Sequence, residues 1–315
     1  MENTRTKTTR TKTTRNSLIL LLTAAIWGMA FVSQSKGMDY MHPFTFNGVR
    51  SLIGAASILV YILISRKIAG DKAAPLDWKL NVKAGLLCGI FLTIASTLQQ
   101  FGIKYTSVGK AGFITTLYII FVPMFGIFLK KKVAPVVWAA AVMAAVGMYL
   151  LCMTESLRLG AGDIMVFLCA IAFAIQIMTV DHYAARIDGA VVSCIQFTVC
   201  GVVCCIGALI WGQPTFGQLQ EGLGALLYAG VLSCGVGYTL QIVGQKGLNP
   251  TVAALIMSLE SVIATISGWI AYKIGFLTTD QTLTARQIAG CVIVFAAVIL
   301  VQLPPEWFRF GKKNA

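Results

Sequence analysis

The chain has 315 residues, of which 57% are hydrophobic and 12% charged, with a formal net charge of +13 and a mean hydropathy of +0.79. This composition excludes an ordinary soluble globular protein. The apolar runs lack the two-residue alternation of membrane-spanning strands, which excludes a transmembrane β-barrel.

The N-terminal segment, residues 1–16, is basic and polar. The pentapeptide Arg-Thr-Lys-Thr-Thr begins at Arg5 and again at Arg10. A segment of this polarity cannot bury enough apolar surface to fold by itself, so we predict a disordered tail. The apolar stretch from Ser17 to Phe31 resembles a secretory signal. However, it is long and has no clear small-residue cleavage site, and we interpret it as a retained first membrane span.

Ten apolar runs make up most of the chain. Each is close to the roughly 20 residues that a helix needs to cross a bilayer core. They lie at 17–36, 43–65, 82–103, 107–129, 134–153, 161–182, 189–211, 221–245, 250–273 and 285–303. The longest polar connection, 66–80, is too short for an independent domain. We therefore predict an all-α integral membrane protein with ten transmembrane helices, followed by a cytoplasmic tail at 304–315.

The basic residues predict the orientation of these spans. With the N-terminus in the cytoplasm, 18 of the 25 Lys and Arg fall inside and six outside, and Arg50 lies within a span. The positive-inside rule therefore places both termini in the cytoplasm. The net charge then reflects topology and contact with anionic lipid headgroups, so we expect a lipid bilayer and no nucleic acid as partner.

The third and eighth runs contain an internal repeat. TLQQFGIK at 97–104 returns as TLQIVGQK at 239–246, 142 positions later, and the register extends to further pairs. Five crossings separate the copies, so the two halves should have inverted topology, a common arrangement in secondary transporters. We predict two five-helix repeats, at 17–153 and 154–303.

Two ionisable residues lie deep within the runs, where a charge costs at least about 2.5–3.5 kcal/mol. Glu260 is ten residues into its run, or about 15 Å down, and Arg50 is about 10 Å down, on the same helix face as Asn47. Across the 142-residue register Glu260 corresponds to Tyr118, and Arg50 has a neutral counterpart near Gln196. Residues present in only one half are free to be functional.

We therefore expect Glu260 and Arg50 to face a central cavity, together with Asn47 on the same helix face as Arg50. Glu260 would bind a cationic group or a proton, and Arg50 an anionic group, which together suit an amino-acid-like zwitterion. Two alternatives stay open at this point. The two residues could pair with each other, or Arg50 could extend to the membrane surface as a structural residue.

Other polar and aromatic residues in the runs are weaker candidates. Gln99 and Gln241 either line the cavity or form interhelical hydrogen bonds. Tyr118 and Tyr238 either stack on a planar solute or pack, and Trp27 either borders the cavity or packs on Gly28. Pro123 removes a backbone hydrogen bond in mid-run and predicts a kink, which is either a hinge for alternating access or static.

Neither a metal site nor a cofactor site is expected. The nine cysteines include no CxxC pair, and the two histidines stand at run ends on opposite sides of the membrane. The chain has no GxxxxGK[ST] sequence for ATP. It also has no pair of intramembrane acids or histidine cluster of the kind that a membrane-embedded enzyme would need, so we do not expect an enzyme.

Several stretches resemble the EamA family of the drug/metabolite transporter superfamily. The segments that carry the resemblance are AAIWGMAFVSQSKG, HPFTFNGVRSLIGAASILV, YTSVGKAGFITTLYIIFVPMFGIFL, GAGDIMVFLCAIAFAIQ, NPTVAALIMSLESVIATISGW and RQIAGCVIVFAAVIL. They span about 17–303. Departures from the family pattern are Ser261 in place of proline, and Lys130-Lys131-Lys132 and Tyr272-Lys273-Ile274 in place of segments with an acidic residue.

This resemblance implies solute transport in the bacterial cytoplasmic membrane. We expect a secondary transporter of small organic metabolites, amino-acid-like or cationic, that exports its solute by alternating access at a midplane site between the repeats. Protons or other ions would supply the drive. An uptake permease of the same fold is the alternative, and a channel is a further one. The sequence names neither the solute nor the oligomeric state.

Overall fold

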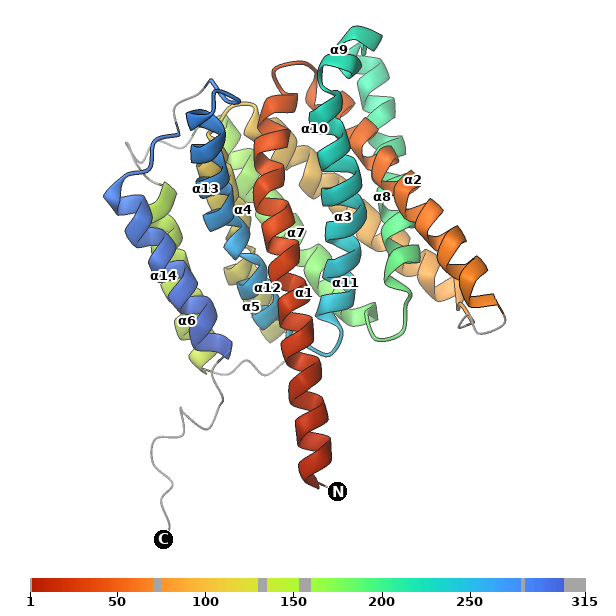
Figure 1. Cartoon of the computed structure of the whole chain (residues 1–315), viewed down its shortest axis with the longest axis vertical. Coiled ribbons are helices and arrows are strands. Elements are labelled where there is room, and N and C mark those ends of the chain that lie inside the picture. The colour runs from red at the N-terminus through yellow and green to blue at the C-terminus, as the bar shows by residue number, and fades with distance from the viewer. Residues whose placement is uncertain (1, 71–74, 130–134, 153–159, 279–280, 303–315) are drawn as a thin grey trace.

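The computed structural model describes residues 2–70, 75–129, 135–152, 160–278 and 281–302 (Figure 1). The chain is helical and has no strand within these ranges. In chain order the helices are α1 (Glu2–Gly37), α2 (Pro43–Ala69), α3 (Trp78–Ile103), α4 (Val108–Thr116), α5 (Tyr118–Phe128), α6 (Pro135–Cys152), α7 (Ala161–Tyr183), α8 (Gly189–Gly207), η2 (Ala208–Gly212), α9 (Phe216–Glu221), α10 (Leu223–Leu227), η3 (Tyr228–Gly237), α11 (Tyr238–Gln245), α12 (Pro250–Met257), α13 (Leu259–Lys273) and α14 (Ala285–Gln302). The segments η2 and η3 are π-helical.

Eight segments within the described ranges are long and apolar enough to cross a membrane. They are Thr13–Gly37, Pro43–Ala69, Trp78–Ile103, Val108–Phe128, Ala161–Tyr183, Gly189–Gly212, Leu223–Gln245 and Pro250–Lys273. Shorter apolar helices at Pro135–Gly147 and Ala285–Leu300 coincide with the fifth and tenth predicted runs. A count of ten crossings stays a prediction, and the tail at 304–315 lies outside the described residues.

The N-terminal segment differs from the prediction. Helix α1 begins at Glu2, so it includes residues that we expected to form a disordered tail. The physical reason is that neither Gly nor Pro interrupts the chain before Gly28, and an existing helix adds further residues without a new nucleation step. In Figure 1 these first turns extend beyond the rest of the bundle.

Polar residues start most of the helices where the chain turns back. Their side chains accept hydrogen bonds from backbone N–H groups of the first turn that have no partner within the helix. Asp77 accepts from Leu80 N–H before α3, and Ser107 accepts from Lys110 N–H before α4. Asp188 and Asn249 act in the same way before α8 and α12, and Pro250 follows Asn249 at the first helical position.

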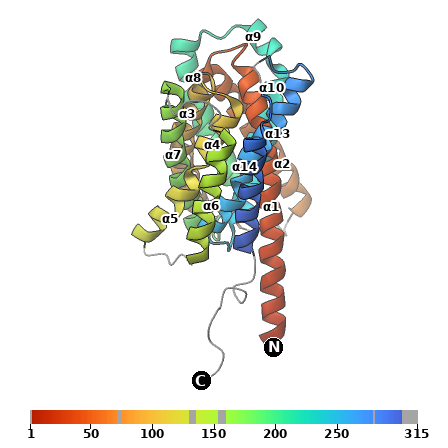
Figure 2. The same ribbon diagram turned by 90° about the vertical axis from the view of Figure 1, so that its left-hand side faces the viewer.

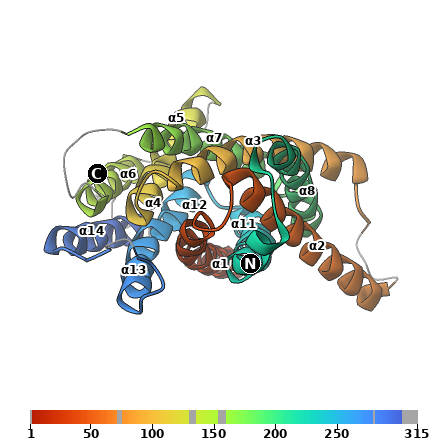
Figure 3. The same cartoon turned by 90° about the horizontal axis from the view of Figure 1, so that it is seen from above.

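Helix packing is the same in the two halves of the chain. Helix α2 packs on α8, and α6 on α14, each helix meeting its own counterpart. Contacts of α3 with α7 and α8 correspond to contacts of α11 and η3 with α1 and α2. Contacts of α7 with α4 and α5 correspond to those of α1 with α12 and α13. Figure 3 shows α1 and α12 near the middle of the bundle, and Figure 2 views the edge formed by α6 and α14.

The glycine of the repeated segment explains part of this packing. A Cβ on Gly102 would lie 2.8 Å from the carbonyl oxygen of Gly162, where α3 meets α7. A Cβ on Gly244 would lie 2.7 Å from the side chain of Leu20, where α11 meets α1. Small residues allow close approach of helices in membranes. Therefore both copies of the segment need glycine at this position.

The helical spans that follow each copy are interrupted at matching places. Leu117 separates α4 from α5, and Ser258 separates α12 from α13. Near the second break the hydroxyls of Ser258 and Ser261 donate to the carbonyl oxygens of Leu255 and Ser258, at 2.7 and 2.8 Å. Such back-bonding bends helices. Pro123, the predicted hinge, lies inside α5, so the helix continues through it and the break comes earlier.

Candidate functional site

A buried cavity lies where the two halves of the chain face each other. It is lined by seven of the eight residues proposed as binding or coupling residues from the sequence: Glu260, Arg50, Gln99, Gln241, Tyr118, Tyr238 and Trp27. Its free volume is about 30 Å³, which accommodates a water molecule or two but no metabolite. A solute can therefore bind only after the surrounding helices move apart.

Many lining residues are equivalent under the 142-residue register. The pairs are Phe31 and Phe173, Gln34 and Gln176, Leu92 and Cys234, Ser96 and Tyr238, Gln99 and Gln241, and Tyr118 and Glu260. Sequence reasoning missed Phe31, Gln34, Leu92, Ser96 and Thr115. Gln34 corresponds to Gln176 in the register, as Gln99 corresponds to Gln241, and this relation is the signal that could have found Gln34. The cavity therefore surrounds the pseudo-symmetry axis between the two halves.

Glu260 lies in the first turn of α13, directly after the break at Ser258. Its side chain is only 4% exposed, and its Oε1 accepts a hydrogen bond of 3.0 Å from the hydroxyl of Tyr118. The N-terminal end of a helix favours a negative charge, which partly offsets the cost of burying this carboxylate. The second carboxylate oxygen has no hydrogen-bond partner among the described residues and is open to the cavity.

Arg50 is held from one side by the residue one helical turn before it. Its Nε donates to Asn47 Oδ1 at 2.9 Å, and its guanidinium carbon lies 5.5 Å from the ring centre of Phe46. The two terminal nitrogens donate to no described residue. Arg50 is 5% exposed, so its side chain does not extend to the surface, in contrast to the second alternative above.

Of the eight residues proposed for binding or coupling, Asn47 alone does not line the cavity. It is buried behind Arg50, and its Nδ2 lies 3.1 Å from Ser96 Oγ and 3.4 Å from Thr97 Oγ1 and Cys204 Sγ. These contacts tie α2 to α3 and α8. Asn47 is therefore placed to orient Arg50 and not to contact a solute.

The two charged residues do not neutralise each other. The ion pairs found among the described residues are Lys36–Asp39 and Lys110–Asp163, so Arg50 and Glu260 are not paired within that part of the chain. Each has a neutral counterpart in the other half. His42 and Asp188 cap the N-termini of α2 and α8. When these two caps are aligned in sequence, Arg50 corresponds to Gln196. The cavity thus has one cationic and one anionic group on a pseudo-symmetric frame.

Three aromatic rings form one wall of the cavity. Tyr238 lies 4.5 Å from Trp27 and 4.9 Å from Phe197, measured between ring centres. The indole N–H of Trp27 donates to the carbonyl oxygen of Ser233 at 3.4 Å, within the π-helix η3. This bond anchors the indole against η3, and Trp27 is among the residues that line the cavity.

Glutamines form the polar remainder of the lining. Gln99 donates to Thr115 Oγ1 at 3.2 Å, and Gln241 donates to Gln176 Oε1 at 3.2 Å. These bonds join helices, as one of the two alternatives predicted. The side-chain oxygens of Gln34 and Gln241 nevertheless have no hydrogen-bond partner within the described ranges. The residues that line the cavity therefore include two unpaired side-chain acceptors in addition to Glu260.

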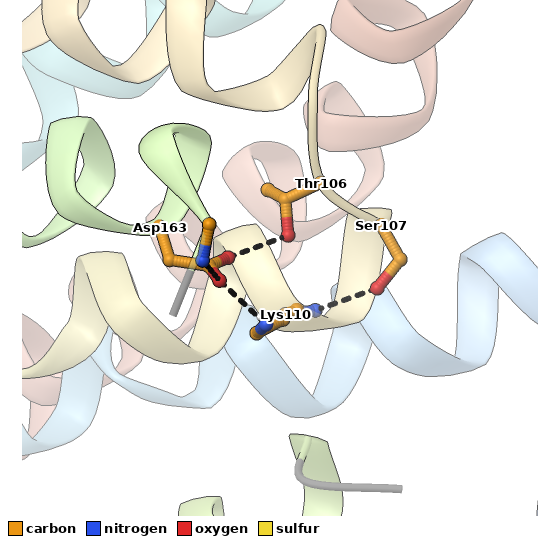
Figure 4. Close-up of polar contacts among 5 residues, drawn as sticks. Thr106, Ser107, Lys110 and Asp163 are labelled. Carbon is orange, nitrogen blue, oxygen red and sulfur yellow. Dashed lines mark hydrogen bonds and ion pairs between the residues drawn. The ribbon is translucent and has the colours of Figure 1, made fainter. Parts of the chain in front are cut away.

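A second polar cluster joins the first turns of α4 and α7 (Figure 4). It lies at the end of the bundle opposite the start of α1 (Figure 1). Lys110 Nζ forms an ion pair of 2.6 Å with Asp163 Oδ2, and Thr106 donates to Asp163 Oδ1 at 2.9 Å. Asp163 also accepts from Gly160 N–H at 2.9 Å, at the start of α7. This cluster lies away from the cavity and ties two helices together at one end.

No group of three or more His, Cys, Asp or Glu side chains is arranged to hold a metal ion in the part of the chain that the structure describes. Eight cysteines are free thiols there. Cys234 lines the cavity. Cys200 and Cys204, on α8, contact Ser51, Ser96 and Thr97 through their sulfur atoms. These thiols pack between α2, α3 and α8.

Comparison with known proteins identifies the family. The chain matches the model of the EamA-like transporter family twice, over residues 15–153 and 160–303. It is 27% identical over 290 residues to an uncharacterized transporter of Archaeoglobus fulgidus, covering 90% of this chain and 84% of the relative. It is 24% identical over 294 residues to the uncharacterized transporter YwfM of Bacillus subtilis, covering 92% and 94%.

A crystal structure of another protein has the same fold. Its TM-score is 0.72 at 16% sequence identity, and the alignment covers 94% of this chain and 99% of the other. The relatives are named transporters and not enzymes. Because the family model matches nearly the whole chain in two consecutive copies, this multi-pass membrane protein belongs to the EamA-like transporter family.

Proposed function

We propose that the protein is a secondary transporter that binds a small zwitterionic or cationic organic solute, with amino-acid-like charges, in the cavity between its two halves. The observation that carries this proposal is that Arg50 and Glu260 line the same buried cavity without pairing to each other. Uncompensated charges in a bilayer core are costly. A solute of complementary charge supplies the missing partners.

Each end of such a solute has a matching group. An ammonium group has three donors, and the free oxygen of Glu260 together with the unpaired oxygens of Gln34 and Gln241 offers three acceptors. A carboxylate can bind the two terminal nitrogens of Arg50, which Asn47 holds in place. The Trp27–Tyr238 wall packs against the part between the charged ends or interacts with a cation through its rings.

The matching breaks in α4–α5 and α12–α13 support a mechanism of alternating access. Broken helices at the interface between inverted repeats surround the sites of many transporters. The small cavity corresponds to a closed conformation. Movement of the two halves against each other opens it to one side of the membrane at a time. When a cationic group leaves, Glu260 is again a buried carboxylate without a counter-ion, and uptake of a proton neutralises it. We propose exchange of solute for protons, with export as the direction.

The test is binding and flux with purified protein in proteoliposomes. A library of amino acids, polyamines and cationic drugs is screened by thermal stabilisation against wild type and the Glu260→Gln variant. Loss of a buried charge partner costs about 2–5 kcal/mol, so we expect at least about 30-fold weaker binding in the variant. The exposed Glu221→Gln change is the matched control.

Flux then decides direction and class. Saturation and trans-stimulation are expected for a transporter, and their absence would indicate a channel. Inside-out vesicles with an imposed proton gradient distinguish export from uptake. If a solute is transported equally well by wild type and a well-folded Glu260→Gln variant at every pH, Glu260 is neither a binding nor a coupling residue, and that part of the proposal is wrong.

A further inference from the structure

A groove separate from the central cavity opens at the end of the bundle where α1 begins. It lies between the last turns of α2, the start of α3, the turn from α7 to α8, and α11, and its volume is about 630 Å³. Tyr61, Ile62 and Val243 form its inner walls. All three belong to segments that are long and apolar enough to span a membrane. They precede Arg66 and Lys246 by three to five residues, so they lie about 4.5–7.5 Å further into the bundle along their helices.

The rim of this groove carries three cations: Arg66, Arg186 and Lys246. Lys246 Nζ donates to the carbonyl oxygen of Ile187 at 3.2 Å, and Arg186 donates to the carbonyl oxygen of His182 at 3.4 Å. None of the three forms an ion pair with a described residue. They come from α2, from the turn between α7 and α8, and from the residue after α11, so the fold gathers them at one place.

The two carboxylates near the rim are already engaged. Asp77 accepts from Leu80 N–H at 2.9 Å, and Asp188 accepts from the N–H groups of Ala190 and Val191 at 2.9 and 3.1 Å. Each satisfies the first turn of a helix. The cations of the rim therefore remain without an anionic partner within the described chain.

We propose that this groove binds the phosphate-bearing headgroup of an anionic phospholipid, with an acyl chain along Tyr61 and Ile62. Arginine side chains bind phosphate oxygens in pairs of parallel hydrogen bonds. Basic pockets between transmembrane helices suit anionic lipid headgroups. The apolar inner walls distinguish a lipid from a free phosphate ion, which has no use for them. The lipid would tie α2 to α8 and α11. This site is separate from the cavity proposed to bind the transported solute, so the two proposals are independent.

The test uses the full-length protein, delipidated and reconstituted in nanodiscs of phosphatidylcholine with or without phosphatidylglycerol. We expect phosphatidylglycerol to raise the midpoint of thermal unfolding of wild type by about 2 °C or more. Native mass spectrometry should show one retained phosphatidylglycerol. The Arg66→Gln, Arg186→Gln variant should lose both effects. The Lys67→Gln, Lys83→Gln variant removes the same charge from exposed positions outside the groove and should keep them.

The side chain of Arg66 forms no hydrogen bond with a described residue, so Arg66→Gln alone should preserve the fold. We expect this variant to lose at least half of the thermal shift that phosphatidylglycerol causes. Equal losses in the groove variant and the Lys67, Lys83 control would mean general attraction to a charged surface and would overturn the site. The absence of any phosphatidylglycerol effect on wild type would also overturn it. If inorganic phosphate in phosphatidylcholine discs reproduced the shift, the ligand would be an ion and not a lipid.

Discussion

The hydroxyl of Tyr118 donates a hydrogen bond of 3.0 Å to the carboxylate of Glu260, and the two residues occupy the same position in the two repeats. The pseudo-symmetry axis therefore passes between a phenol and an acid. A duplicated chain that kept identical residues here would place two phenols or two acids together. Divergence at this one pair gives the cavity its negative charge.

Removing this hydrogen bond should destabilise the protein. In Tyr118→Phe the buried carboxylate of Glu260 loses its hydrogen-bond donor, and a lost bond to a charged group costs about 1.5–3 kcal/mol. Tyr238→Phe is the matched control. Tyr238 lines the same cavity, but its hydroxyl makes no hydrogen bond with a described residue. Thermal unfolding of both variants in one detergent provides the comparison. Equal shifts would show that the Tyr118–Glu260 bond contributes nothing.

Asn47 should act on the solute only through Arg50. Asn47→Ala removes the acceptor that holds the guanidinium, and we expect about tenfold weaker solute binding, equivalent to about 1.4 kcal/mol. In an Arg50→Gln background the same change should have no further effect, since the group it positions is gone. Binding constants from the four proteins of this cycle give the coupling. Additive losses would mean that Asn47 acts independently of Arg50.

Close packing at the repeated glycine should be intolerant of a methyl group. The added carbon of Gly102→Ala would meet the backbone of α7, and overpacking of this kind costs about 1–3 kcal/mol. Gly224→Ala is the control, because nothing lies within 4 Å of its added carbon and alanine favours a helix. The expression level and the midpoint temperature of thermal unfolding should fall for Gly102→Ala and stay unchanged for Gly224→Ala. A stable Gly102→Ala protein would contradict the observed distance between α3 and α7.

The Lys110–Asp163 ion pair should matter more than Lys36–Asp39 at the same end of the bundle. Asp163 is buried, with its side chain 4% exposed, whereas Asp39 is 52% exposed. Removing the partner of a buried charge is costly, and removing a surface partner is not. We expect Lys110→Met to cost about 2 kcal/mol and Lys36→Met less than about 1 kcal/mol. Thermal unfolding of the two variants at several salt concentrations measures both losses of stability. Equal losses in Lys110→Met and Lys36→Met would show that Asp163 is exposed to water as Asp39 is.

Stability should also depend on pH through His42, which lies outside the spans. Burial, together with the nearby positive charge of Lys104, lowers the pKa of His42 below its ordinary value of 6.5. Its neutral Nδ1 accepts from Phe44 N–H at 3.3 Å at the start of α2. The unfolded chain takes up the proton first as pH falls, so this contribution is complete above pH 6.5 and is lost toward and below the lowered pKa.

The control for this effect is His42→Asn, since asparagine also caps helices and does not titrate. Between pH 8 and pH 5 the wild-type unfolding midpoint should fall more than that of the variant. Parallel curves for the two proteins would show that His42 carries no pH dependence.

The sequence determined the positions of the helices and the duplication. A bilayer requires each span to be a long apolar helix with its backbone hydrogen bonds satisfied internally, so Glu260 and Arg50 could be recognised as deep charges from their positions alone. The 142-residue register likewise related Glu260 to Tyr118 before any contact was known. These properties are local or periodic, and composition and spacing are sufficient to predict them.

Tertiary structure decided which of these residues meet. Trp27 could have packed on Gly28, but the rotation of α1 against η3 places it on the cavity wall. Asn47 shares a helix face with Arg50, yet contacts from α3 and α8 turn it away from the cavity. The rim cations of the lipid groove come from three separated segments. Such contacts depend on helix rotation and on packing between distant segments, which no spacing within a single helix specifies.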